Sequence, residues 1–166
     1  MPQKNNVSNQ SSHQSPHHLP QPRQSESALN SSFPQVLVGF DPGRDKCGIA
    51  VMGLDRTLYF HEVVASERAI ATLTQMQNQF QVQQIILGDQ TTSKAWKARI
   101  EQGLSHPLPI QFVDERYTTL EARDRYWAMF PPQLLTRLVP KGLRPLPRPI
   151  DDIVAILLIE RCLAAE

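Results

Sequence analysis

Val36-Leu37-Val38-Gly39-Phe40, followed at once by Asp41-Pro42-Gly43, is the stretch from which the fold of this chain can be worked out. The first five residues form a nearly continuous apolar run rich in β-branched and aromatic side chains, which is typical of a strand buried on both faces. The Asp-Pro-Gly that follows predicts a turn. Two more strands are expected at Gly48 to Gly53 and at Leu58 to Ala65, joined by a hairpin connection at Asp55-Arg56. The chain therefore opens with three antiparallel strands.

Helices and strands alternate after these three strands. The expected elements, in order, are a helix N-capped by Ser66, a strand from Val82 to Leu87, a helix from Lys94 to Gln102, a strand from Pro109 to Val113, a helix opened by a Thr118-x-x-Glu121 capping box, and a last helix from Asp151 to Leu163. Parallel strands need crossover helices. We therefore expect an α/β fold with a mixed five-stranded sheet and helices on both faces.

The composition divides the chain into a polar tail, residues 1–34, and a domain, residues 35–166. Ser, Gln, Asn, Pro and His supply 25 of the first 34 residues, a composition that predicts a disordered tail. The chain has no run of 18 apolar residues and no signal-peptide pattern, which favours a cytoplasmic protein without a membrane partner. Cys47 and Cys162 show no Cys-x-x-Cys spacing, so neither a disulfide framework nor a zinc site is indicated.

The basic residues of the domain are unevenly distributed. The whole chain carries 17 Lys and Arg against 16 Asp and Glu, so its net charge says little about partners. No acidic residue lies between Asp124 and Asp151, a segment that includes the prolines from Pro131 to Pro149. We expect phosphate contacts there, from Lys141, Arg144 and Arg148, although a solvated basic loop has the same composition.

Acidic residues follow the expected strands and open the last helix. They are Asp41, Asp89, Asp114-Glu115 and Asp151-Asp152. The carboxyl ends of parallel strands meet at one edge of a sheet, and the final helix can bring its first turn to the same place. Carboxylates brought that close repel one another unless a cation lies between them, and Mg²⁺ prefers such oxygen ligands. Two ions about 4 Å apart can support phosphodiester hydrolysis.

Each of these acidic residues also has a structural explanation. Asp41 could stabilise its turn, Asp89 could cap the following helix, and Asp151 or Asp152 could cap the last one. Glu115 could pair with a neighbouring arginine on the surface. Independent capping does not require these residues to converge, and their joint placement favours a site. Gly43 would let a phosphate group approach the backbone closely.

Three segments carry a resemblance to a known family. They are Gly39-Phe40-Asp41-Pro42-Gly43 with Gly48-Ile49-Ala50-Val51, Asp114-Glu115-Arg116-Tyr117-Thr118-Thr119 with Glu121-Ala122, and Ile150-Asp151 with the apolar helix behind it. In these segments the chain resembles the YqgF family, also called RuvX, of the ribonuclease H-like superfamily. The similarity extends from Val36 to Leu163.

The resemblance implies a ribonuclease H-like fold and an endonuclease acting on pre-16S rRNA, with a relationship to Holliday-junction resolvases. It also implies that Asp41, Glu115 and Asp151 are the catalytic carboxylates and hold Mg²⁺ or Mn²⁺. Arg116 and Thr118 would contact phosphate or orient Glu115. Where the family usually has Gly-Leu-Pro after the fourth strand, this chain reads Gly88-Asp89-Gln90-Thr91, so Asp89 is a candidate additional ligand. Asp152 is a second candidate that fits the pattern less well.

Three other interpretations remain open on sequence. The protein could cut branched DNA, and a resolvase is expected to form a homodimer because two strands are cut symmetrically. It could instead be a non-catalytic nucleic-acid-binding or ribosome-assembly module. A Gly-x-Asp-x-Gly turn also occurs in ATPases of the actin and sugar-kinase type, but those proteins need two such domains and this chain has the length of one.

Overall fold

The computed structural model describes residues 34–90, 92–116 and 118–165. The expected tail therefore lies outside the described residues, except Pro34, and so do Thr91 and Tyr117 of the segments quoted above. Five strands form one sheet, in the order β3-β2-β1-β4-β5. They are β1 (Gln35–Asp41), β2 (Lys46–Gly53), β3 (Leu58–Ala65), β4 (Gln81–Gly88) and β5 (Ile110–Val113). The expected α/β fold with a mixed sheet is confirmed.

The strand directions follow from the connections. β1, β2 and β3 are antiparallel neighbours joined by short turns, and β4 and β5 run parallel to β1. The parallel strands are reached through α1 (Ala69–Gln79) and α2 (Ser93–Gly103). α3 (Thr118–Met129) and α4 (Asp151–Ala165) follow β5, and two short 3₁₀ helices lie between them, η1 (Leu134–Leu138) and η2 (Lys141–Leu143).

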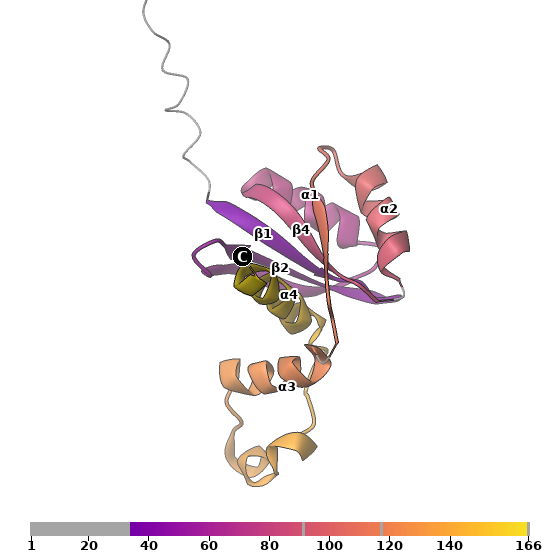
Figure 1. Cartoon of the computed structure of the whole chain (residues 1–166). Helices are drawn as coiled ribbons and strands as arrows, with labels where there is room; N and C mark the ends of the chain where they lie inside the picture. The colour runs from indigo at the N-terminus through magenta and orange to yellow at the C-terminus, as the bar shows by residue number, and fades with distance from the viewer. Residues whose placement is uncertain (1–33, 91, 117, 166) are drawn as a thin grey trace, which may run out of the picture. The chain divides into compact units, whose positions relative to one another are not determined.

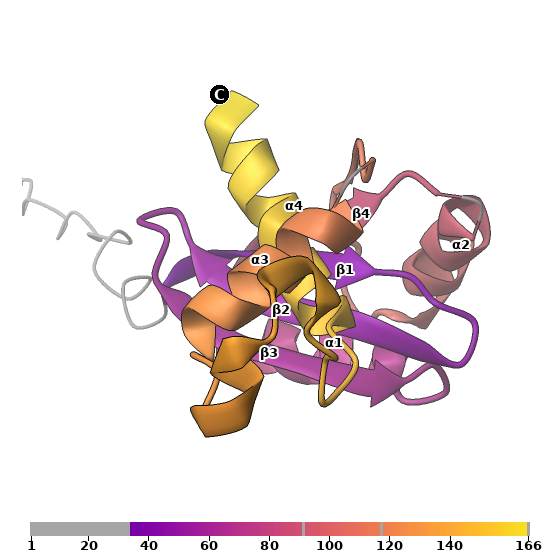
Figure 2. The same ribbon diagram turned by 90° about the horizontal axis from the view of Figure 1, so that it is seen from below.

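Helices cover both faces of the sheet. Because side chains alternate along a strand, Val36, Val38 and Phe40 of β1 face one way and pack with residues of α1 and α2. Leu37 faces the other way and packs with α3 and α4. Figure 1 shows α1 and α2 together on one side and α4 on the other, and Figure 2 shows α3 crossing over α4.

The last helix lies against the middle of the sheet. Eight of its 15 residues are buried, which fits the nearly continuous apolar run of its sequence. Two glycines allow the close approach. A Cβ added to Gly39 would lie 2.1 Å from the Ala155 carbonyl oxygen, and one added to Gly48 would lie 1.9 Å from the Asp151 carbonyl oxygen. The absence of a side chain at Gly48 therefore lets the first turn of α4 reach β2.

Replacing Gly48 with Ala is expected to destabilise the fold by about 2 kcal/mol or more, because the backbone of the first turn of α4 must move away. Urea denaturation measures the change. Gly142→Ala is the matched control, since nothing lies within 4 Å of the position of its added Cβ. Equal stability of the two variants would show that Gly48 does not set the position of α4.

Two expected helix starts differ from the structure. α1 begins at Ala69 after a turn, and Arg68 rather than Ser66 occupies the N-cap, without a side-chain hydrogen bond. Thr118 is already the first helical residue of α3, and its hydroxyl donates 2.7 Å to the Glu115 carbonyl oxygen. Glu121 is bound by Arg161 at 2.9 Å. In α3 the bond of Thr118 to the Glu115 carbonyl oxygen and the contact of Glu121 with the distant Arg161 replace the expected capping box. Among the described residues, none of the helices has the length and apolar character needed to cross a bilayer.

Candidate functional site

Three predicted acidic residues lie at one edge of the sheet. Asp41 ends β1, where it pairs with Gly48 of β2, and the preceding Phe40 pairs with Leu87 of β4. Asp41 is therefore flanked by Gly48 and by Gly88, the residue after Leu87. The backbone of Asp151 lies over Gly48, and the Glu115 carboxylate lies over Gly88, within 2.5 Å of the position of an added Cβ. Strand register and two glycines thus bring Asp41, Glu115 and Asp151 together.

Asp41 and Glu115 are in direct contact. Burial, the hydrogen bond to Glu115 and the negative charges of Glu115 and Asp151 raise the pKa of Asp41 from 3.8 to about 9. Asp41 is therefore protonated at neutral pH in the metal-free protein and donates the hydrogen bond to Glu115. The like charges of Glu115 and Asp151 oppose ionisation of Asp41, and a bound cation removes that opposition.

Glu115 is held in place by hydrogen bonds between its backbone and neighbouring residues. Its side chain is only 5% exposed, and its Oε2 atom has no hydrogen-bond partner among the described residues. The Thr118 hydroxyl and backbone N–H both donate to the Glu115 carbonyl oxygen, at 2.7 and 3.1 Å. The Glu115 N–H donates 3.2 Å to Asp89 Oδ1. Thr118 and Asp89 therefore orient Glu115, and in the described part of the chain Glu115 forms no ion pair with an arginine.

Asp151 is partly exposed, with a quarter of its side chain accessible. It is the first residue of α4, and its side chain is half-buried. Lys46 Nζ lies 3.9 Å from Asp151 Oδ2, and the Lys46 side chain is 49% exposed. An exposed pair at this distance contributes little to stability. Lys46 can therefore move away from Asp151 at low cost when another cation approaches.

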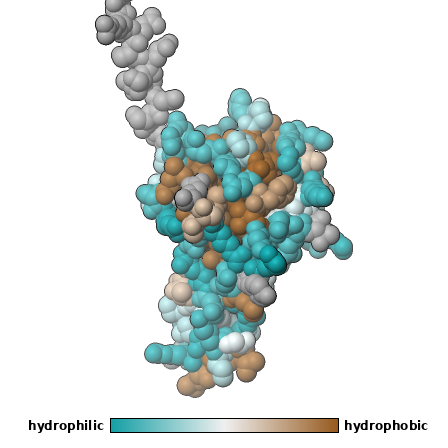
Figure 3. All heavy atoms as spheres, in the orientation of Figure 1, coloured by the Kyte–Doolittle hydropathy of each residue, from teal (hydrophilic) through white to brown (hydrophobic). Residues whose placement is uncertain are grey.

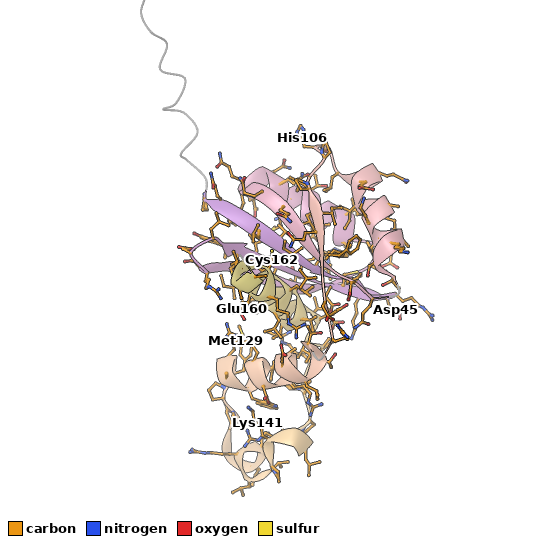
Figure 4. The ribbon with its side chains drawn as sticks, in the orientation of Figure 1. Asp45, His106, Met129, Lys141, Glu160 and Cys162 are labelled. Atoms are coloured by element: carbon orange, nitrogen blue, oxygen red, sulfur yellow. The ribbon has the colours of Figure 1, made fainter. Side chains whose placement is uncertain are left out.

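The Asp-Pro-Gly turn is fixed from the side of α2. Trp96 Nε1 donates 3.1 Å to the Gly43 carbonyl oxygen, and the Thr92 hydroxyl donates 3.0 Å to the Pro42 carbonyl oxygen. A Cβ on Gly43 would lie 1.9 Å from the Lys46 carbonyl oxygen, so the glycine is required by close backbone contact. None of the glycines in the described part of the chain has a positive φ. The turn thus holds Asp41 at the edge of the sheet; Figure 4 labels Asp45 in the same loop.

Asp152 does not join the other acidic residues. It is 2% exposed and faces β3, where the His61 Nδ1 atom lies 2.6 Å from Oδ2. Arg148 donates to both carboxylate oxygens, at 2.8 and 3.1 Å. Burial opposes ionisation of Asp152, but the hydrogen bonds from Arg148 and His61 outweigh it and lower its pKa. Asp152 therefore binds Arg148 and His61, and these contacts hold α4 against β3.

The predicted basic contacts fall into two groups. Arg148 is bound to Asp152, and Arg144 donates 2.8 Å to the Val139 carbonyl oxygen and so folds the connection on itself. Arg116 and Lys141 are exposed, at 82% and 54% of their side chains, and pair with Asp114 and Asp124 on the surface. Lys141, labelled in Figure 4, lies on the part of the connection that extends beyond α3. Arg116 and Lys141 remain accessible to a phosphate.

The donor set suits a hard divalent cation. Carboxylate oxygens are the ligands that Mg²⁺ and Mn²⁺ prefer, and Glu115 Oε2 is a buried oxygen without a partner. As they stand, the described residues contain no group of three or more His, Cys, Asp or Glu side chains that could hold a metal ion. Asp41 and Glu115 are instead hydrogen-bonded to each other. Loss of the Asp41 proton and rotation of these side chains would free their oxygens for a cation.

Sequence reasoning did not find the residues that support this site. Trp96 and Thr92 contact a turn some fifty positions earlier in the chain, and neither spacing nor residue type indicates such a contact. The sequence contained one indication of the contact between His61 and α4, because His61 is a polar residue on the face of β3 that packs toward α4. Alternation along β3 places it on that face with Val63.

Comparisons with known proteins assign no family to the chain. No family model matches it, and no curated protein matches it. Among solved structures it is similar to a ROK family transcriptional regulator, a homolog of the E.coli MLC protein, at 12% identity and a TM-score of 0.36. The alignment covers 55% of this chain and 31% of that one, so the chain spans about a third of the regulator's length.

Proposed function

We propose that the protein is a metal-dependent endonuclease with a ribonuclease H-like fold, which hydrolyses phosphodiester bonds in structured nucleic acid. The observation that carries this proposal is the convergence of Asp41, Glu115 and Asp151 at one edge of the sheet, from three distant parts of the sequence. Three antiparallel strands followed by two parallel ones, with helices on both faces, agree with what the YqgF resemblance implies.

The three carboxylates have distinct tasks in this proposal. Mg²⁺ or Mn²⁺, when bound, supplies positive charge that stabilises the transition state and makes a water molecule more acidic. Glu115 is held by Thr118 and Asp89 before any cation arrives, so its orientation needs little rearrangement. Asp41 would have to lose its proton to serve as a ligand, and Asp151 would add a carboxylate from the first turn of α4. Arg116, next to Glu115 and exposed, is placed to contact a phosphate of the substrate.

The substrate class follows from the resemblance. A precursor of 16S rRNA, processed in the cytoplasm, is the proposed substrate, and a four-way DNA junction is the alternative. A junction resolvase would act as a homodimer, whereas processing of a single RNA strand can be done by a monomer.

Mn²⁺-dependent cleavage of a small substrate panel tests the proposal. The panel contains a precursor rRNA end, a single-stranded RNA and a four-way DNA junction. We expect a defined cut by the wild-type protein. The cleavage rate should fall by more than roughly a hundredfold in Glu115→Gln, because losing a metal ligand should cost more than losing a residue that only hydrogen-bonds to a ligand. Glu101→Gln is the matched control, since Glu101 is half-exposed and pairs only with Lys97. A folded wild type that cuts none of the three substrates would contradict the proposal.

A further inference from the structure

The connection between α3 and α4 forms a cavity with aromatic and proline walls. Its volume is about 470 Å³, within the range of roughly 300–1,000 Å³ found for small-molecule sites. Trp127, Phe130, Pro132 and Pro147 supply apolar walls, and Gln133 and Thr136 supply polar groups. The carboxylate site, formed by Asp41, Glu115 and Asp151, does not include any of these residues, so the cavity is a separate feature.

Aromatic rings line this cavity in a continuous row. Tyr126 lies 5.0 Å from Trp127, edge to face, and 5.0 Å from Phe130, measured between ring centroids. Phe130, which follows the last residue of α3, is 41% exposed. Figure 3 shows further apolar surface on the same projecting segment, where Leu135 and Leu138 are exposed. The rings thus offer flat apolar surface that the fold itself leaves partly uncovered.

The charge around the cavity favours an anionic occupant. The Arg144 guanidinium lies 5.9 Å from the Trp127 ring and donates to the backbone carbonyl oxygens of Val139 and Arg137, so in the described part of the chain no carboxylate neutralises it. The Arg148 guanidinium, 5.5 and 5.6 Å from the rings of Tyr126 and Phe130, is already paired with Asp152 and adds no free charge. No acidic residue occurs anywhere from 125 to 150. An aromatic and proline surface also suits proline-rich peptides, but this charge distribution matches a ligand that carries phosphate.

We propose that this cavity receives one unpaired nucleobase of the nucleic acid, stacked on Phe130 and Trp127. The inference rests on the proposed function and adds a substrate feature, an unpaired base in the bound nucleic acid. Bases that are not paired can stack on aromatic side chains, and this is the usual way in which proteins recognise single-stranded regions. The cavity walls belong to the chain segment that leads from Glu115 through α3 to Asp151. A base bound there would be held by the segment that connects Glu115 with Asp151.

Binding in EDTA tests the cavity without any cleavage. The probes are a fluorescently labelled twelve-nucleotide oligouridylate and an oligomer of the same charge in which every base is missing. The wild type is expected to bind the first about tenfold more tightly, and Phe130→Ala is expected to lose most of that preference. Phe112→Ala, which removes an equally exposed phenylalanine from β5, should keep it.

The outcomes separate the two proposals. Equal binding of the two oligomers by the wild type, or equal behaviour of Phe130→Ala and Phe112→Ala, would overturn the nucleobase cavity and leave the nuclease proposal in place. Binding of a proline-rich peptide that is lost in Phe130→Ala, with no preference between the oligomers, would overturn it in favour of a peptide site. A base preference that depends on Phe130 in a protein that cuts no substrate would support the cavity and remove the nuclease proposal.

Discussion

Replacing Asp41 with Asn is expected to make the metal-free protein more stable and to abolish cleavage. In the folded, metal-free wild type Asp41 keeps its proton, because it is buried and lies next to Glu115 and Asp151, whereas it ionises in the unfolded chain; folding above about pH 4 therefore requires the uptake of a proton, which lowers the stability. Because the folded-state pKa of about 9 is above the usual value, the stabilising contribution of Asp41 is complete below about pH 4 and is lost as the pH rises toward 9. Asn carries no charge, and its amide N–H can donate to Glu115 in place of the acid proton.

The gain in stability should therefore grow between pH 5 and pH 8, reaching on the order of 2 kcal/mol near pH 7. Cleavage by the same variant should fall by more than roughly a hundredfold, because a ligand of the cation is missing. Urea denaturation in EDTA and the cleavage assay measure the two effects. Asp124→Asn is the control, since Asp124 is 65% exposed and pairs only with Lys141. A loss of both stability and cleavage in Asp41→Asn would mean that Asp41 has a structural role.

Replacing Arg148 with Met is expected to destabilise the protein by about 3 kcal/mol at pH 7. The change leaves the buried Asp152 carboxylate with His61 as its remaining partner, and breaking a buried ion pair from one side costs about 3–5 kcal/mol. In the wild type the pKa of Asp152 is lowered, so its contribution is present above the unfolded pKa and is lost as the pH falls below it. The difference between variant and wild type should therefore shrink below about pH 4.

Urea denaturation at pH 7 and at pH 3.5 measures this dependence. Arg125→Met is the matched control, because Arg125 pairs with Glu160 near the surface, where such pairs contribute about 0–1 kcal/mol. A loss of equal size in the two variants would contradict the assigned role of Arg148. Arg148→Met also tests the position of Asp151, which precedes Asp152 in the first turn of α4.

The backbone of this fold is readable from the sequence. The apolar run at β1 and the alternation of later elements predicted the five strands and the four α-helices, with ends that differ by at most three residues from the structure, but not the 3₁₀ helices η1 and η2. The convergence of Asp41, Glu115 and Asp151 could also be predicted, because each residue follows a strand or opens a helix and topology then brings these positions together. The order of the strands and helices determines this placement, and local sequence patterns predict that order.

Side-chain partnerships between distant elements were not readable. Asp151 and Asp152 are adjacent in sequence, yet one faces the carboxylate site and the other faces β3, and only the orientation of α4 decides which does which. Arg148 was expected to contact phosphate, whereas it binds the buried carboxylate of Asp152. Asp89 was considered a ligand or a cap, and it receives the Glu115 N–H instead. These side-chain contacts depend on three-dimensional packing, which cannot be predicted from the spacing of residues in a single sequence.

Titration of Mn²⁺ into the wild type and into Asp41→Asn by isothermal calorimetry tests the central claim most directly. Repeating the titration at pH 7 in two buffers of different ionisation enthalpy counts the protons released. The carboxylate site predicts that the wild type binds Mn²⁺ and releases about one proton, since Asp41 must ionise to become a ligand. Binding should be lost in Asp41→Asn. Binding of Mn²⁺ by Asp41→Asn with the affinity of the wild type would contradict the assignment of Asp41, Glu115 and Asp151 as the metal site.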